Sequence, residues 1–219
     1  MRQSSTSMTS AARTEDDSAA VPSALSRRLA IVPLSYGQRS LWFLYQMAPK
    51  SSAYNLAMSL ELGNAVDADA LGLAVQTIIN RHASLRSVFV VQDGQPACHV
   101  VPFLPVPLRC VDASTWSDAR LLATIDRDAH KPFDIERGPC VRAILYEREK
   151  RPAFLFGAHH LVADLMTFTQ VLEELADLYP HCVAGERPSL TPPPVTFADF
   201  VTWQQQLLDG PEGERVWSF

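Results

Sequence analysis

Residues 153–157 (AFLFG) form an uninterrupted apolar run, and this run constrains the fold more than any other part of the sequence. A strand that alternates apolar and polar residues can face water on one side, whereas a strand without alternation is buried on both faces. Such a strand needs packed side chains on each side of its sheet. The run therefore predicts a central strand in a layered protein.

Helical and extended patterns alternate along the rest of the chain, and Asp93-Gly94 is typical of a hairpin turn between two strands. Ser35 and Asp67 can each cap a helix. Helices are expected over residues 35–48, 67–79, 116–130, 167–179 and 197–208, and further strands over 53–62, 86–92, 97–101, 106–111 and 140–146. The pattern predicts an α/β (α+β layered) fold with a mostly antiparallel sheet flanked by helices.

Three regions differ in composition. Residues 1–30 are rich in Ser, Thr and Ala and are expected to be a disordered tail or linker. Residues 31–186 are expected to form one subdomain. Residues 187–219 begin with a proline-rich stretch and continue into a helix, so they are expected to lead to a second subdomain. Because an apolar helical pattern restarts near the last residue, we expect the chain to be a fragment.

Composition excludes several classes of function. The net charge is -5 and no basic stripe is present, so nucleic acid is not an expected partner. No apolar stretch approaches the ~18 residues of a membrane span, and no secretory leader is evident, so no membrane association is expected. The four cysteines show no CxxC pairing, which indicates free thiols and a cytoplasmic location.

Two histidines and an aspartate follow the apolar run: His159, His160 and Asp164. A positioned imidazole can take a proton from an amine or hydroxyl that attacks an acyl carbon, which typically accelerates a reaction by ~10²–10⁴. A His pair can equally be structural or ligate zinc. No HExxH helix and no evident fourth ligand accompany it, so no metal site is predicted. No GxSxG elbow is present either. On its own, the pair leaves catalytic and structural interpretations open.

Five segments together resemble, in order and spacing, the motifs of condensation domains from nonribosomal peptide synthetases. They are residues 35–44 (SYGQRSLWFL), 81–89 (RHASLRSVF), 132–143 (PFD…GP…RA), 158–165 (AHHLVADL, similar to the HHxxxDG signature) and 197–203 (FADFVTW). Each motif alone is weak, but five in sequence are a strong indication of membership.

The resemblance implies a fold like chloramphenicol acetyltransferase, in which two similar halves enclose the active site. It implies an acyltransferase that needs no intrinsic cofactor. Acyl or peptidyl carrier proteins bring substrates on phosphopantetheine arms, and an acceptor amine attacks the donor thioester. The C-terminal half of the domain is the other expected partner, and the isolated chain is expected to be inactive.

The resemblance also assigns residues. His160 is the second histidine of the signature and would position or deprotonate the acceptor, whereas His159 is expected to be more structural. Asp164 is expected to hold the loop by pairing with an arginine, with Arg86 favoured over Arg81; both arginines are expected to support the site structurally.

One departure is Leu165, which stands where the family has glycine. A glycine there would allow unusual φ angles or a close approach to substrate, options that leucine largely lacks. Ester formation, an unusual release reaction, weak activity or a hybrid polyketide–peptide assembly line therefore stay open. Two alternative functions stay open as well. One is a CoA-dependent or polyketide-associated HxxxD acyltransferase, and the other is a module that docks carrier proteins without catalysis.

Overall fold

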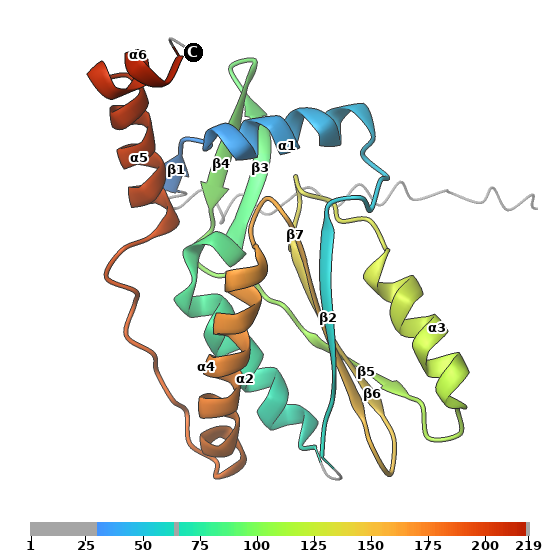
Figure 1. The fold of residues 1–219 in the computed structure, drawn as a ribbon. Helices are drawn as coiled ribbons and strands as arrows, with labels where there is room; N and C mark the ends of the chain where they lie inside the picture. Colours follow the sequence, from blue (N-terminus) through green and yellow to red (C-terminus); the bar gives the residue numbers. More distant parts are fainter. Residues whose placement is uncertain (1–29, 64–65, 218–219) are drawn as a thin grey trace, which may run out of the picture.

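The computed structural model describes residues 30–63 and 66–217 (Figure 1). Apart from Ala30, the tail expected over residues 1–30 lies outside these residues. None of the helices in the described ranges is long and apolar enough to cross a membrane.

The larger sheet has four strands in the order β2-β7-β6-β5. Their bounds are β2 (Asn55–Glu61), β5 (Leu108–Asp112), β6 (Val141–Glu147) and β7 (Ala153–His159). Neighbours are antiparallel except for the parallel pair β5–β6. Strand β7 is internal and all seven of its residues are buried. The prediction of a central strand from its apolar run is confirmed.

A smaller antiparallel sheet has the order β1-β4-β3. Its strands are β1 (Ala30–Val32), β3 (Ser87–Gln92) and β4 (Gln95–Val100). The turn between β3 and β4 has Asp93 at φ 52° and Gly94 at φ 75°. Two consecutive left-handed residues match the right-handed twist of a hairpin. The predicted hairpin is therefore confirmed.

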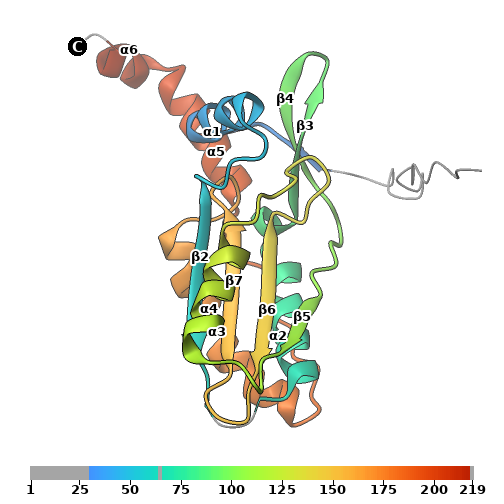
Figure 2. The same cartoon turned by 90° about the vertical axis from the view of Figure 1, so that its right-hand side faces the viewer.

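Helices cover both faces of the larger sheet. α2 (Ala68–Arg81) and α4 (Leu165–Val183) pack side by side on one face, and α3 (Asp118–Ala129) covers the other (Figure 2). α1 (Tyr36–Met47) crosses above the end of the sheet where β7 finishes (Figure 1). The remaining elements are a short 3-10 helix η2 (Ala83–Arg86), α5 (Phe197–Leu208) and α6 (Pro211–Trp217). The predicted layered fold with helices flanking mainly antiparallel sheets is confirmed.

Side-chain caps set where the helices begin. Ser35 and Asp67 accept backbone hydrogen bonds at the starts of α1 and α2, as the sequence predicts. Helix α4 differs from the prediction at both ends. Asp164 caps it, so it begins at Leu165, and it continues past Pro180 to Val183. This early start places the first turn of α4 directly beside the histidine pair.

Candidate active site

His160 lies just beyond β7 and is exposed. Its backbone N–H donates to the carbonyl of Tyr54 over 2.9 Å, and its ring Nδ1 lies 2.8 Å from the carbonyl oxygen of Ala163. A carbonyl oxygen only accepts hydrogen bonds, so Nδ1 must carry the proton. The neutral ring therefore keeps its lone pair on Nε2, which can accept a proton.

His159 is only 3% exposed and has a different environment. Its Nδ1 accepts a hydrogen bond from the backbone N–H of Leu161 over 3.2 Å, and its ring packs edge-on against Tyr45 and Phe133. Burial, reinforced by the charge of neighbouring His160, lowers the pKa of His159 to about 4. The ring is therefore neutral near pH 7 and forms part of the core.

Asp164 is the N-cap of α4. Its Oδ1 accepts hydrogen bonds of 2.8 Å from both the backbone N–H and the hydroxyl of Thr167, and its own N–H donates to the Thr167 hydroxyl over 3.1 Å. The bond from the Thr167 backbone lowers the pKa of Asp164 more than burial raises it, and His160 adds to the lowering. Asp164 is therefore a fixed negative charge near His160.

The expected pairing of Asp164 with Arg86 is wrong. The guanidinium of Arg86 donates to the carbonyls of Ile79 over 3.2 Å, Val101, and Pro102 over 3.1 Å. Arg86 therefore joins the end of α2 to the end of β4. Nε and Nη1 of Arg86 donate to these backbone oxygens, while Oδ1 of Asp164 accepts from Thr167.

The second choice, Arg81, is also wrong as a partner of Asp164. Arg81 pairs with Glu174 in the middle of α4 at 3.4 Å, and Nε2 of His82 lies 2.9 Å from both carboxylate oxygens of Glu174. The RHxxLR segment thus contacts α4, the helix that Asp164 caps. The contact is at Glu174, ten residues after Asp164. A supporting role for Arg81 and Arg86 in catalysis stays a prediction.

Gln38, which lies in the first of the five matched segments, connects α1 to the histidine loop. Its Oε1 accepts from the Ser35 N–H over 3.1 Å, and its Nε2 donates to the Leu161 carbonyl over 2.9 Å. The Ser-x-x-Gln spacing is typical of a capping box and could have indicated the first bond. The second bond joins residues 123 positions apart, and no local pattern predicts it.

Phe133 and Arg142 support His159 from the other side. The Arg142 guanidinium lies 3.7 Å from the centre of the Phe133 ring, which in turn packs edge-on against His159. Arg142 also donates to the carbonyls of Asp128 over 2.6 Å and Lys131 over 2.5 Å. Arg142 therefore fixes the loop that carries Phe133, and Phe133 packs against the buried His159.

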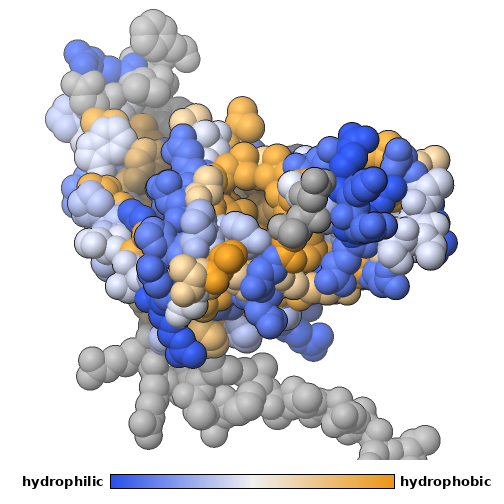
Figure 3. All heavy atoms as spheres, turned by 90° about the horizontal axis from the view of Figure 1, so that it is seen from below, coloured by the Kyte–Doolittle hydropathy of each residue, from blue (hydrophilic) through white to orange (hydrophobic). Residues whose placement is uncertain are grey.

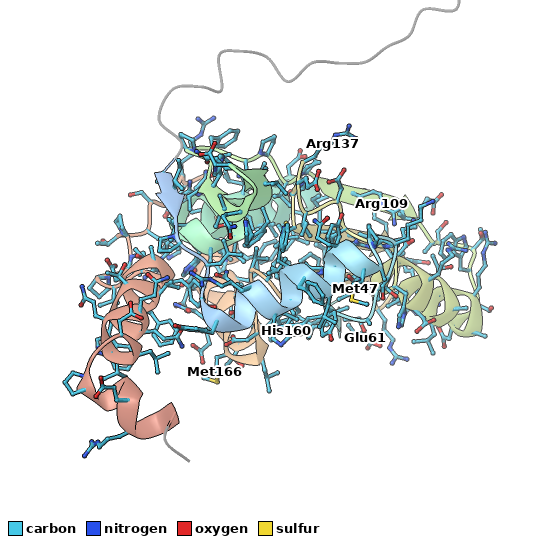
Figure 4. All side chains as sticks on the ribbon, turned by 90° about the horizontal axis from the view of Figure 1, so that it is seen from above. Met47, Glu61, Arg109, Arg137, His160 and Met166 are labelled. Atoms are coloured by element: carbon cyan, nitrogen blue, oxygen red, sulfur yellow. The ribbon has the colours of Figure 1, made fainter. Side chains whose placement is uncertain are left out.

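A cavity of about 310 Å³ lies at this loop. Its lining includes His160, Asp164, Gln38, Ser84, Thr167 and Phe197. In the view from above, His160 is labelled next to α1, near the edge of the molecule (Figure 4). Among the described residues, no group of His, Cys, Asp and Glu is arranged to hold a metal ion. The cavity therefore combines one potential base, His160, with one fixed carboxylate, Asp164.

A second cavity, of about 390 Å³, lies on a different part of the molecule. It is lined mainly by apolar side chains of β2, α2 and α4, including Leu60, Leu71, Leu172 and Leu175. Seen from below, apolar side chains surround a hollow (Figure 3). Tyr179 is the one ionisable residue among the described residues of this lining, and its hydroxyl oxygen accepts a hydrogen bond from the backbone N–H of Asp67 over 2.9 Å. This cavity offers no acid–base pair, unlike the cavity at His160.

Comparison with known proteins points to one family. The family model described as "Condensation domain" matches residues 29–218. Chondramide synthase cmdD of Chondromyces crocatus is 39% identical over 190 residues, which are 84% of this chain and 5% of that protein. Isonitrile lipopeptide synthase of Mycobacterium tuberculosis is 35% identical over 190 residues, which are 85% of this chain and 8% of that protein. The chain thus spans a small part of these relatives.

Solved structures give the same fold. The first condensation domain of the calcium-dependent antibiotic synthetase, in complex with a substrate analogue, has a TM-score of 0.76 at 22% identity. The match covers 85% of this chain and 45% of that one. The X-domain in the complex of X-domain and OxyB from teicoplanin biosynthesis has a TM-score of 0.76 at 29% identity, over 86% of this chain and 40% of that one. The chain spans less than half of each structure, and the predicted chloramphenicol-acetyltransferase-like fold is confirmed.

Proposed function

Because this chain belongs to the condensation-domain family of nonribosomal peptide synthetases, we propose that it is the N-terminal part of a domain that joins a carrier-bound acyl or peptidyl thioester to an acceptor amine. The substrates are carried on phosphopantetheine arms of carrier proteins. The four cysteines, all free, support a reducing cytoplasmic setting.

The hydrogen bond from His160 to Ala163 is the observation that carries this proposal. It fixes the tautomer in which Nε2 is unprotonated, so the ring can take a proton from the acceptor amine as the nitrogen attacks the thioester carbon. The new C–N bond forms, the C–S bond breaks, and the proton passes from the imidazole to the departing thiolate.

Asp164 and His159 have supporting roles in this proposal. The ionised Asp164 stabilises the imidazolium of His160 by its negative charge. His159 is neutral and buried, so it supports the loop and exchanges no proton near pH 7. A hydroxyl acceptor would be deprotonated in the same way, so an ester product is compatible with this arrangement.

The test is turnover by the complete condensation domain that carries this chain, with aminoacyl groups on both carriers. His160→Gln is expected to lower kcat by about 10²–10⁴ without changing the melting temperature. His130→Gln, on a largely exposed histidine, is the matched control. Full activity of His160→Gln would show that the base lies elsewhere.

The same assay separates the alternatives. Product formed from CoA thioesters without a donor carrier favours a CoA-dependent acyltransferase. A wild-type domain that binds carriers but forms no product is a docking module. We also propose that residues 1–219 alone are inactive, which the 45% coverage of a condensation-domain structure supports; product formed by this chain alone would refute that statement.

A further inference from the structure

Three cationic side chains line a cavity of about 370 Å³ that has no lining residue in common with the cavity at His160. They are Arg109 on β5, Lys131 just after α3, and Arg142 on β6. Among the described residues of this lining there is no Asp or Glu, and the other members are proline or aliphatic. In the view from above, Arg109 and His160 are labelled on opposite sides of α1 (Figure 4). We call this space the cationic cavity.

The strand register places the two arginines on one face of the larger sheet. β5 and β6 are a parallel pair in which Arg109 lies opposite Ile144, two residues after Arg142. Alternate residues of a strand point to the same face, so both arginines lie on the face that α3 covers. Lys131 reaches the same place because it follows the end of α3. The cluster is therefore held by the core of the fold.

Asp128, near the end of α3, holds two of the cations in place but balances only one positive charge. Its carboxylate accepts hydrogen bonds from Arg109 and, over 2.8 Å, from the Tyr146 hydroxyl, and it lies 2.7 Å from Nζ of Lys131. The Asp128 side chain is 2% exposed and lies behind the cavity lining. Arg142 donates to backbone carbonyls, which carry no net charge. Three positive charges and one negative charge leave an excess of two.

Hydrogen-bond donors remain free on the open side of the cluster. Among the described residues, the side chains of Arg109 and Lys131 have Asp128 as their one polar partner, and Arg109 uses only Nη2 for it. These side chains are 49% and 54% exposed, so a ligand can reach them. Burial is the main cause that lowers the pKa of Arg142, and repulsion from Arg109 adds to the lowering against the attraction of Asp128. An anion in the cavity would relieve this repulsion.

We propose that the cationic cavity binds an organic phosphate monoester. A phosphate monoester carries a charge of about −1.5 to −2 at pH 7, which matches the excess of two, whereas a carboxylate supplies a single negative charge. Guanidinium groups bind phosphate oxygens with a pair of parallel hydrogen bonds. The chain as a whole has a net charge of -5, so this local positive excess is not a general property of its surface.

The remaining walls favour a phosphate that carries an uncharged organic group. Pro107, Pro132 and Pro139 have no backbone N–H to donate to an anion, and the other wall residues are aliphatic. A water molecule takes about 30 Å³ of liquid, so a cavity of about 370 Å³ has room for more than a phosphate group. The organic group would cover the apolar walls. Because the lining is separate from that of the His160 cavity, this inference does not depend on the function proposed above.

Isothermal titration calorimetry with the complete condensation domain that carries this chain tests the proposal. The probes are inorganic phosphate, phenyl phosphate and adenosine 5′-monophosphate, with phenol and adenosine as uncharged counterparts. Both esters are expected to bind more tightly than inorganic phosphate and than their uncharged counterparts, and their binding is expected to weaken with added salt. The tighter ester shows whether a nucleotide or a simpler phosphate is the source.

Arg109→Gln and Lys131→Gln are each expected to weaken binding of the tighter ester about tenfold, because each removes a charged hydrogen-bond donor. Each variant leaves the other cation on Asp128, and an unchanged melting temperature shows that the fold is intact. Arg137→Gln is the matched control, since Arg137 is 84% exposed and lies outside the lining. It is expected to bind the esters as the wild type does.

Several results would overturn the proposal. If inorganic phosphate binds as tightly as the esters, the cavity holds an adventitious ion only. If the uncharged counterparts bind equally well, the cavity does not recognise charge. Equal weakening in Arg137→Gln and Arg109→Gln would show general electrostatic attraction, and unchanged binding in both Arg109→Gln and Lys131→Gln would place the phosphate elsewhere. If no probe binds at millimolar concentration, the rest of the domain fills the cavity. A domain that binds the esters but has no turnover would refute the proposed function and leave this inference standing.

Discussion

The side-chain amide of Gln38 donates a 2.9 Å hydrogen bond to the carbonyl oxygen of Leu161, between residues 123 positions apart in sequence. Gln38 is the one buried residue of α1, with 8% exposure, and Leu161 is 2% exposed. A buried carbonyl that loses its donor is costly. This bond therefore fixes α1 relative to the loop that carries His160.

Replacing Gln38 with leucine should lower the free energy of unfolding by about 1–3 kcal/mol, because the Leu161 carbonyl then stays buried without this donor. Urea denaturation measures the change. Gln46→Leu, on an exposed position of the same helix, is expected to have little effect. Similar losses in both variants would contradict the special role of Gln38.

The contacts of the two arginines predict a contrast between two double-mutant cycles. Arg81→Gln and Glu174→Gln should couple by about 1–3 kcal/mol, because their side chains pair while only 23% and 11% exposed. Arg86→Gln and Asp164→Asn should be additive within about 0.5 kcal/mol, because these residues bind other partners. Both cycles are measured by urea denaturation, and the reverse pattern of coupling would contradict the observed contacts.

The contacts of Gln38 and of the two arginines also show what the sequence can and cannot predict. Helix caps such as Ser35 and Asp67 act over three or four residues, so local spacing indicates them. The partners of Arg81 and Gln38 are decided by how distant elements pack. Motif matching singled out His160 and Asp164, which line one cavity, but it could not tell which group each arginine meets.

The buried His159 predicts a loss of stability in mild acid. Its pKa is about 4 in the folded chain and near the ordinary 6.5 when unfolded. Between these values the unfolded chain binds more protons, so the stability is complete above pH 6.5 and is lost as the pH falls toward 4. The contribution of this group falls by at most about 1.4 kcal/mol per pH unit.

Urea denaturation across this pH range tests the assignment. His159→Phe keeps an aromatic ring but cannot titrate, so it should show a shallower pH dependence, although it is less stable at pH 7 without the acceptor for the Leu161 N–H. His130→Phe, at a side chain that is 63% exposed, is the control for replacing a histidine by phenylalanine. An unchanged slope in His159→Phe would place the titration at another group.

Arg142→Leu should destabilise the chain by about 3 kcal/mol, because it removes charged donors from the carbonyls of Asp128 and Lys131 and the cation from the Phe133 ring. Thermal and urea unfolding measure the loss. Arg137→Leu is the control, since its side chain is 84% exposed. A loss of less than about 1 kcal/mol in Arg142→Leu would show that the loop holds His159 without this arginine.

Strand β7 is buried on both faces, which leaves no polar side to define its alignment with its neighbours. Side-chain size can do this instead. Gly157 lies opposite Arg142, and a Cβ at Gly157 would approach the Arg142 Cγ to 3.1 Å. A slip by one residue would bring Phe156 or Ala158 into this narrow place. It would also move His159 to the place of His160 in the first case, and His160 to the place of His159 in the second. The smallest residue of the strand thus determines which histidine is buried and which is exposed.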